Sequence, residues 1–386
     1  MKNIAVIFGG RSVEHDISIL TGLHAAAHIE NARVHYVYLT RENRMLTGAV
    51  LAEIDFYIMG GKGGAKRCWF ADGCLCRGLR RTKIDAILNC CHSGVGENGE
   101  LAAYCRVAGV PVTSCNYIAA ANLQSKIRTR EILTAAGFDQ PKFAAVSKED
   151  CHPEQSRGIS ADSPTMQGFL RFGRNDIHID FPVIVKPDTL GSSIGVSVAH
   201  NETELRESLE LVFEMDSRAI VEEFFDGVIE VNCAAMRAYG EVKVSACEDI
   251  NRKREFLDFE NKYLDATSGF IKKGKNAGET EDDSSALYTE IAHLTRKAYE
   301  LFGASGVVRA DFLVVSKVGG VSRTILNEIN TVPGFLAYHL WARAGMPYGL
   351  VIDLAVKQAI ADAESSKSTK TVFKSDILIK NRGLVR

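Results

Sequence analysis

The sequence predicts an α/β protein of two or three domains that begins with a doubly wound parallel sheet. The chain has 386 residues, which is too long for a single hydrophobic core. Its first apolar run, residues 4–8, ends in Gly9-Gly10 and is followed by a helical pattern. Strand-like runs then alternate with helical runs, an order typical of parallel sheets with helices on both faces.

The first unit begins with the strand at 4–8, and Ser12 is placed to cap a helix from about Val13. Its other expected elements are strands at 34–39 and 84–90, an irregular stretch containing GGKGG, a helix at 99–108 and a short strand in VPVTS at 110–114. Parallel strands need such helical crossovers. We therefore expect one parallel sheet here.

The rest of the chain predicts further strands and helices around two polar stretches. A single helix is expected at 119–136, ended by Gly137 and Pro141. Strands at 142–147 and 181–187 flank residues 148–180, which show no sustained period and are interpreted as a surface insertion. The remaining predictions are helices at 202–214, 285–302 and 347–363, strands at 219–225, 230–238, 241–250, 309–315 and 325–331, a polar loop at 251–285 and a solvated tail.

Composition favours a protein that works on small molecules in the cytosol. The formal charge is −2, which gives no overall reason to expect nucleic acid or an anionic membrane as a partner. The apolar run after Met1 is too short for a secretory or membrane-spanning segment. The ten cysteines are spread out, and Cys68, Cys74 and Cys76 lack the paired spacing of a zinc site.

Oxygen-bearing side chains recur at every second position of two strand-like runs. In RADFLVV, Arg309 and Asp311 share one face, and in ILNEINT, Glu328 and Asn330 share one face. Unpaired carboxylates are costly to bury, and such oxygen atoms suit Mg²⁺ bound together with nucleotide phosphates. The alternative is a set of satisfied polar residues at the edge of a sheet.

A glycine- and serine-rich turn follows the strand at 181–187. The strand carries Lys186, and the turn contains Gly191, Ser192 and Ser193. Glycine allows backbone N–H groups to approach phosphate oxygens, hydroxyls add donors, and lysine supplies positive charge. The ending of a Walker A loop is absent, and a plain serine-rich turn is the alternative. Together with the acidic strands, the turn favours a site for phosphoryl transfer.

The order of these motifs resembles the ATP-grasp superfamily and, within it, the D-alanine:D-alanine ligases. The motifs are FGGRSVEHDIS, HSGVGENG, VIVKP with GSSIG, VEEFF, ENKY, VVRADF and LNEINTVPGF. The resemblance covers nearly the whole chain except 148–180 and the tail. It implies an N-terminal domain at 1–117, a central domain at 118–225 and a C-terminal domain at 226–386, with ATP held between the last two, which are α+β domains.

The resemblance implies a set of nucleotide and metal contacts. ATP is expected to contact Lys126, Lys186, Gly191, Ser192, Ser193 and Lys262. Glu222 and the segment Glu223-Phe224-Phe225 would lie beside the adenine, and Glu230 would lie near the ribose. The match at Glu230 requires one extra residue in DGVIE. Asp311, Glu328 and Asn330 would hold Mg²⁺ or Mn²⁺, with two ions expected.

The resemblance also implies contacts to the amino acids. Glu14 would hold the ammonium of the first D-alanine, with Ser192 and Tyr263 completing a hydrogen-bonded trio, and His92 would lie beside that substrate. Arg309 and the N–H of Gly334 would stabilise the oxyanion, and His339 and Leu340 would lie at the acceptor. The alternatives are that His92 is an ordinary hydrogen-bonded residue and Tyr263 a half-buried aromatic. A dinucleotide-binding turn is disfavoured because the third glycine is absent.

The implied activity is ATP-dependent joining of two D-alanines through an acyl phosphate, for peptidoglycan precursors, in a cytosolic enzyme that is usually a homodimer. Ser93 and Asn98 depart from the family pattern HGxxGEDG, and Leu190, Ser125 and His339 replace residues common in relatives. His339 leaves D-serine or another acceptor open, while Tyr263 argues against D-lactate. A non-catalytic nucleotide-binding descendant is a further alternative, which the complete set of metal ligands disfavours.

Overall fold

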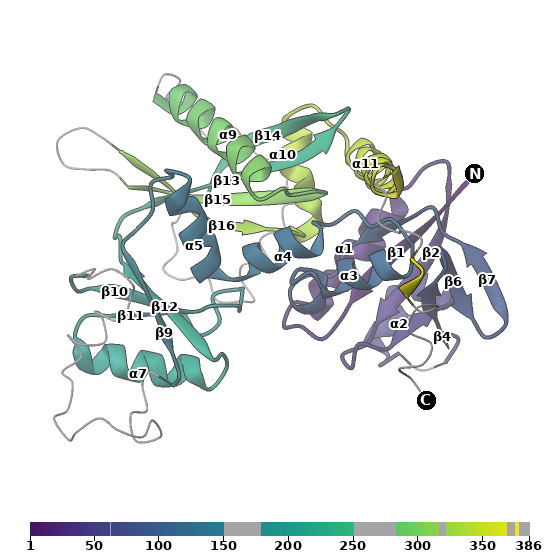
Figure 1. Cartoon of the computed structure of the whole chain (residues 1–386), viewed down its shortest axis with the longest axis horizontal. Helices are drawn as coiled ribbons and strands as arrows, with labels where there is room; N and C mark the ends of the chain where they lie inside the picture. Colours follow the sequence, from purple (N-terminus) through teal and green to yellow (C-terminus); the bar gives the residue numbers. More distant parts are fainter. Residues whose placement is uncertain (62, 150–178, 251–282, 316–321, 369–374, 378–386) are drawn as a thin grey trace.

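The computed structural model describes residues 1–61, 63–149, 179–250, 283–315, 322–368 and 375–377. Figure 1 shows an N-terminal unit on the right and two further sheets on the left and at the centre, each with its own helix. The structure thus has the mixed α/β architecture that the sequence predicts. The domain boundaries expected after 117 and 225 stay predictions.

The N-terminal sheet has the strand order β4-β3-β2-β1-β8. Its parallel centre consists of β1 (Lys2–Gly9), β2 (Ala32–Leu39) and β8 (Ala86–Asn89). The side chains of alternate residues of β1 point to opposite faces of the sheet. Phe8 packs in one core with residues of α1 (His15–Ala27), and Ile7 packs in another with residues of α3 (Glu100–Val107). Helices therefore cover both faces, as predicted.

Several local predictions in this unit are wrong. The stretch around GGKGG contains β3 (Met45–Thr47), η1 (Ala49–Ala52), α2 (Ile54–Ile58) and β4 (Lys66–Arg67), followed by a separate antiparallel sheet of β5 (Trp69–Ala71), β6 (Cys74–Arg77) and β7 (Arg80–Lys83). VPVTS forms only an isolated bridge between Val112 and Ile87. Ser12 donates its hydroxyl to the carbonyl of His92 at 2.8 Å instead of capping a helix.

The single helix predicted at 119–136 is two helices, α4 (Tyr117–Gln124) and α5 (Lys126–Ala135). Ser125 is extended between them, with φ −84° and ψ 114°, and its hydroxyl accepts the N–H of Arg128. The hydroxyl also donates to Asp188 at 2.8 Å. Because this partner lies on a distant segment, the period of the sequence did not reveal the break.

The central sheet has the order β11-β10-β12-β9, with antiparallel neighbours. Its strands are β9 (Phe143–Ser147), β10 (Val183–Pro187), β11 (Ser197–Ala199) and β12 (Arg218–Glu223). One face packs on α7 (Glu202–Phe213) through Val185, Val221 and Leu209. The other face carries Lys186 and Glu222, because they alternate with those apolar residues.

The third sheet, β14-β13-β15-β16, is also antiparallel. Its strands are β13 (Ile229–Ala238), β14 (Glu241–Ile250), β15 (Val307–Val315) and β16 (Arg323–Asn330). One face packs on α9 (Asp283–Leu301), whose Ile291 and Tyr299 share a core with Ala310 and Phe312. The opposite face is left for the polar residues of β15 and β16.

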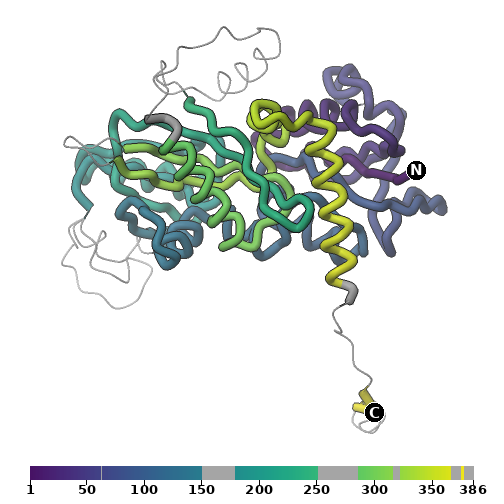
Figure 2. The backbone as a smooth tube through the Cα atoms, turned by 90° about the horizontal axis from the view of Figure 1, so that it is seen from above, coloured from purple at the N-terminus to yellow at the C-terminus, as the bar shows by residue number. Residues whose placement is uncertain are grey.

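The end of the described chain packs back on the first unit. After η4 (Gly334–Ala337) and α10 (Tyr338–Arg343), α11 (Tyr348–Ser368) contacts both β8 and β13. In Figure 2 this long helix runs beside the junction of the two regions. Val351 and Ile352 of α11 share one core with Val6 and Met236, so the N-terminal unit and the third sheet are tied together. The helix begins one residue later than predicted and ends five residues later, at Ser368.

No helix in the described part of the chain combines the length and apolar character needed to cross a membrane.

Candidate active site

The polar face of β15 and β16 brings the predicted metal ligands together. Cross-strand pairing places Asp311 opposite Glu328 and Arg309 opposite Asn330. Arg309 and Asp311 are half-buried, whereas Ala310 and Phe312, which point the other way, are in the core. The alternation that the sequence suggests is therefore present in the structure.

Asp311 is the centre of the polar contacts on this face. Arg309 donates Nε to Oδ1 and Nη2 to Oδ2 of Asp311, both at 2.6 Å, and Asn330 donates Nδ2 to Oδ2 at 2.9 Å. Two carboxylates and an amide fit Mg²⁺ in donor type. In the described residues no three His, Cys, Asp or Glu side chains form a metal cluster, so a third protein ligand would be the Asn330 amide oxygen.

A bulge in β16 directs another side chain toward the central sheet. The register shifts between Asp311 and Phe312, whose partners are Glu328 and Leu326, so Asn327 is the additional residue. Its Oδ1 accepts a hydrogen bond from Arg130 at 3.0 Å and lies 3.4 Å from Nζ of Lys186. Asn327 therefore connects the third sheet to α5 and β10.

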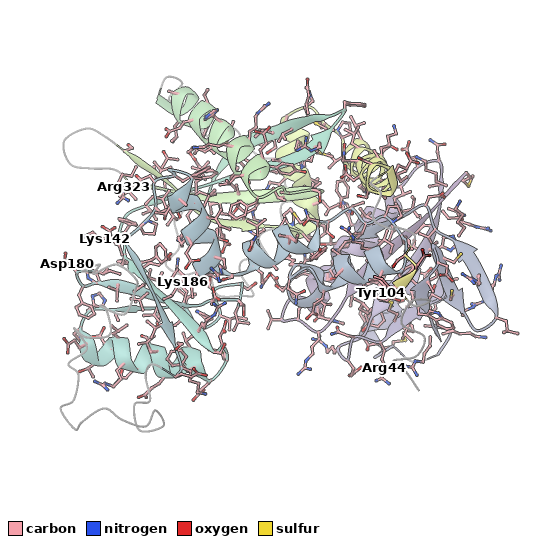
Figure 3. The ribbon with its side chains drawn as sticks, in the orientation of Figure 1. Arg44, Tyr104, Lys142, Asp180, Lys186 and Arg323 are labelled. Atoms are coloured by element: carbon pink, nitrogen blue, oxygen red, sulfur yellow. The ribbon has the colours of Figure 1, made fainter. Side chains whose placement is uncertain are left out.

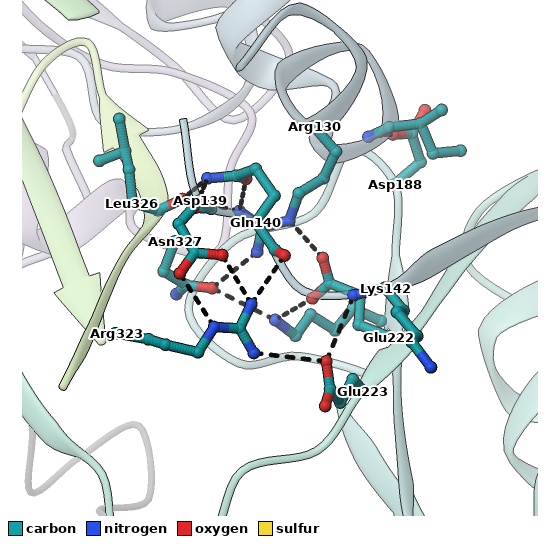
Figure 4. Close-up of polar contacts among 12 residues, drawn as sticks. Arg130, Asp139, Gln140, Lys142, Asp188, Glu222, Glu223, Arg323, Leu326 and Asn327 are labelled. Atoms are coloured by element: carbon teal, nitrogen blue, oxygen red, sulfur yellow. Dashed lines mark hydrogen bonds and ion pairs between the residues drawn. The ribbon is translucent and has the colours of Figure 1, made fainter. Parts of the chain in front are cut away.

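Glu222 lies in a buried charged network with two cations (Figure 4). Its carboxylate accepts hydrogen bonds from Arg130 Nε and, at 2.6 Å, from Lys186 Nζ. Burial alone would raise the pKa of Glu222, but Arg130 and Lys186 lower it to about 2. Arg130 also donates to the Leu326 carbonyl at 2.7 Å, so the network joins the two sheets.

Lys126, the first residue of α5, reaches the glycine- and serine-rich turn. Its Nζ donates to the carbonyl of Leu190, and burial lowers the pKa of the ammonium group. Asp188 accepts the N–H of Ile127 at 3.0 Å and the hydroxyl of Ser125, which anchors the start of this helix. An aspartate from the turn thus provides a carboxylate beside Ser125.

The same turn contacts the N-terminal unit. Ser192 donates its hydroxyl to Oε1 of Glu14 at 2.6 Å, and Ser93 donates to Oε2. Thr189, earlier in the turn, is held by Asp216 through its N–H and its hydroxyl, both at 2.8 Å. Ser192 and Glu14 are two of the three residues of the predicted hydrogen-bonded trio, and they are in contact. The third member, Tyr263, lies outside the described residues, as does Lys262.

His92 is buried, and both of its ring nitrogens are engaged. Nδ1 contacts the carbonyl of Val332 and Nε2 contacts the hydroxyl of Thr21, each at 2.7 Å. The Thr21 hydroxyl also accepts the N–H of Phe335 at 3.3 Å. His92 therefore supports the turn that contains Gly334.

The predicted adenine segment begins with the last two residues of β12, Glu222 and Glu223, and continues into the chain that follows. Glu223 and Phe224 line a pocket of about 190 Å³ together with Lys142, Ile179, Asp180, Phe181 and Pro182. Lys142, Asp180 and Arg323 lie in the same part of Figure 3. Arg323 lies over the ring of Phe225 at 5.2 Å and pairs with Asp139 at 2.7 Å. Glu230 is the second residue of β13, opposite Leu313.

The two predicted acceptor residues have different surroundings. His339 is half-buried, and its Nε2 pairs with Glu248 of β14 at 3.0 Å; Glu248 also pairs with Arg343 at 3.0 Å. The hydrogen bond from His339, opposed by burial, lowers the pKa of Glu248. Leu340 is fully buried, and its side chain packs in the same core as Val351 and Val6.

Sequence reasoning missed four residues of this region. Arg130 is on the same helix face as Lys126, four positions later, so that spacing was a usable signal. Asn327 had no such signal, because the bulge changes which way it points. Thr21 and Asp188 act through partners far away in the sequence.

Comparison with solved structures identifies the fold. The structure matches a D-alanine-D-alanine ligase from Coxiella burnetii with a TM-score of 0.74 and 22% identity, covering 95% of this chain and 96% of that chain. It matches the VanG D-Ala:D-Ser ligase from Enterococcus faecalis with a TM-score of 0.73 and 22% identity, covering 93% and 99%. The fold is therefore the ATP-grasp fold of such ligases.

Sequence comparison gives the family. Residues 3–115 match the family described as D-ala D-ala ligase N-terminus, and residues 132–360 match D-ala D-ala ligase C-terminus. A D-alanine--D-alanine ligase from Thermosipho melanesiensis is 29% identical over 380 residues, covering 95% of this chain and 96% of that relative. The chain belongs to the D-Ala-D-Ala ligase family.

Proposed function

We propose that this protein joins two molecules of D-alanine to D-alanyl-D-alanine and converts ATP to ADP and phosphate. The observation that carries the proposal is the hydrogen bond between Ser192 and Glu14. It joins the loop suited to phosphate with the carboxylate suited to an amino-acid ammonium. The family match over both parts of the chain supports the same assignment.

In the proposed first step, a carboxylate oxygen of the first D-alanine attacks the γ-phosphorus of ATP, and the bond to ADP breaks. Lys126 and Lys186 hold the phosphates, and Glu14 holds the substrate ammonium. A divalent cation at Asp311, Glu328 and Asn330 would supply positive charge to the phosphate oxygens. Lys186 lies 3.4 Å from Asn327 of the third sheet, and Lys126 donates to the Leu190 carbonyl in the glycine- and serine-rich turn, which supports this role.

In the proposed second step, the amine of the second D-alanine attacks the acyl carbon, and phosphate leaves while the amine loses a proton. Arg309 and the N–H of Gly334 stabilise the oxyanion that forms on the acyl group. In the structure Arg309 is held on Asp311, and the Gly334 turn is held by Thr21 and His92. These contacts support a preorganised donor pair.

The experiment is phosphate release from ATP and Mg²⁺ with D-alanine, with L-alanine and without amino acid. We expect release with D-alanine only, together with a product of the mass of the dipeptide. Removal of Mg²⁺ by chelation should abolish release, and Mn²⁺ should restore it. Equal release without amino acid would instead indicate a simple ATPase and would reject the proposal. A homodimer in the cytosol stays a prediction.

A further inference from the structure

Ser93 has a backbone conformation that normally requires glycine. Its φ is +56° and its ψ is 179°, a backbone conformation that residues other than glycine rarely adopt. It directly follows the buried His92 and precedes Gly94, which also has a positive φ. A serine in this place has a backbone cost that must be offset by what its side chain does.

The hydroxyl of Ser93 donates to Oε2 of Glu14, whereas Ser192 donates to Oε1. Each carboxylate oxygen thus has its own hydroxyl donor, one from the N-terminal unit and one from the glycine- and serine-rich turn. Hydrogen bonds to an ionised carboxylate are short and strong. Two donors on opposite oxygens fix the rotation of the carboxylate plane, which one donor alone would not do.

The surroundings place Ser93 at the contact between two regions of the chain. A Cβ built on Gly191 would lie 3.8 Å from the Ser93 hydroxyl oxygen, so this oxygen faces the backbone of the turn. Ser93, Glu14 and Ser192 are all half-buried. The Ser93 hydroxyl therefore contacts the Glu14 carboxylate and lies against the glycine- and serine-rich turn.

We propose that Ser93 is a positioning residue that orients Glu14 for the ammonium of the first amino acid. This inference rests on the proposed function for the identity of that amino acid. Loss of the hydroxyl lets the carboxylate rotate, so ammonium binding weakens while ATP binding is retained. The strained backbone is the structural cost of bringing the hydroxyl to Glu14.

The test compares Ser93→Ala with Ser93→Gly. Both remove the hydroxyl, but only glycine relieves the backbone. We expect both to raise the KM for the first D-alanine about 10- to 30-fold, as loss of one charge-assisted hydrogen bond predicts, with the KM for ATP unchanged. Ser93→Gly should melt at a higher temperature than Ser93→Ala. Asn31→Gly, which also relieves a positive φ of +57° at an exposed turn, is the control and should keep the wild-type KM.

A wild-type KM in Ser93→Gly would overturn the inference. A stability cycle with Ser93→Ala, Glu14→Gln and the double variant tests the contact without turnover. A coupling free energy between Ser93 and Glu14 would support the inference. Absence of phosphate release by the wild-type protein with D-alanine would reject the proposed function, but it would leave this coupling, and so the inference, unaffected. Additive effects on stability would overturn the inference even in an active ligase.

Discussion

The backbone N–H of Phe335 donates to the hydroxyl of Thr21, although 314 positions separate the two residues. The same hydroxyl contacts His92, whose other nitrogen contacts the Val332 carbonyl. Phe335, Leu336 and Ala337 all have φ near +50°, a left-handed conformation that is costly for such residues. The Thr21 and His92 contacts therefore hold a strained turn around Gly334 from both sides.

Thr21→Val should reduce kcat more than it reduces substrate binding. The valine keeps the shape but loses both hydrogen bonds, so the turn relaxes and the Gly334 N–H moves. A shift of about 1 Å at a reacting group can reduce the rate about 100-fold, and we expect a loss of about 10- to 100-fold in kcat. Steady-state kinetics with D-alanine and ATP measure this loss.

The matched control is Thr295→Val, a buried threonine of α9 that donates to the Ile291 carbonyl at 2.8 Å. It should lower stability by a similar amount without a change in kcat, and Thr21→Ser should recover most of the activity. If Thr21→Val and Thr295→Val had the same kcat, the turn would not depend on the Thr21 hydroxyl.

Arg309→Ala should lower kcat by about 100-fold, the typical effect of removing one oxyanion donor. Shortening the predicted insertion at 148–180 should have a smaller effect, because that segment carries no predicted site residue. The same arginine variant leaves the Asp311 carboxylate without its bidentate partner, so the Mg²⁺ concentration for half-maximal rate should fall. Rates measured over a Mg²⁺ series test both expectations.

Arg44→Ala is the control for Arg309→Ala, because Arg44 is exposed and forms an ion pair with the exposed Glu42. It should leave the rate and the Mg²⁺ dependence unchanged. An equal loss of activity in Arg309→Ala and in the shortened insertion would remove the oxyanion assignment.

The sequence predicted the polar face of β15 and β16 better than the neighbouring charged network around Glu222. Arg309 and Asp311 lie on an uninterrupted strand, where side-chain direction follows from counting. Asn327 could not be predicted, because the additional residue of a bulge depends on pairing with β15. Ser125 interrupts the helical pattern because Asp188, 63 positions away, accepts hydrogen bonds from the Ser125 hydroxyl and from the N–H of Ile127 at the start of α5.

The antiparallel sheet β5-β6-β7 was missed for a different reason. Its strands have three or four residues, and β7 reads RRTK, which has little of the apolar alternation that marks a strand. Pairing with Leu75 and Cys76 of β6 makes it a strand. Tertiary pairing outweighed local sequence preference there.

Glu222→Gln should destabilise the protein strongly at neutral pH. Arg130 would remain buried and Lys186 half-buried without their carboxylate, and breaking a buried pair such as Arg130–Glu222 costs about 3–5 kcal/mol. Because the folded pKa of Glu222 is lowered to about 2, the wild-type contribution is complete above the unfolded pKa near 4.5. It is lost as the pH falls from that value toward 2.

Urea unfolding of the wild-type protein and Glu222→Gln between pH 7 and pH 3 measures this effect. The difference in unfolding free energy should stay constant from pH 7 to about pH 5 and then narrow. Glu131→Gln is the control, because Glu131 pairs with Arg128 on the exposed side of α5, and exposed pairs contribute about 0–1 kcal/mol. A pH-independent difference for Glu222→Gln would show that its charge state does not change in this range.

His339 should affect the use of the second amino acid. An imidazole N–H can donate a hydrogen bond to the acceptor carboxylate, so His339→Ala should raise the KM for the acceptor about 10-fold. Glu248 competes for the same imidazole at 3.0 Å, and Glu248→Gln should therefore lower the acceptor KM. Kinetics with D-alanine, D-serine, D-lactate and L-alanine as acceptors measure the KM values and test selectivity.

Arg343→Ala is the control and should keep the wild-type acceptor KM, because Arg343 contacts the other oxygen of Glu248. The comparison separates a direct contact of His339 with the acceptor from a general effect of charge near α10. In the second case both variants would shift the KM alike. An unchanged acceptor KM in His339→Ala would exclude His339 from acceptor binding and leave its pairing with Glu248 as a link between α10 and β14.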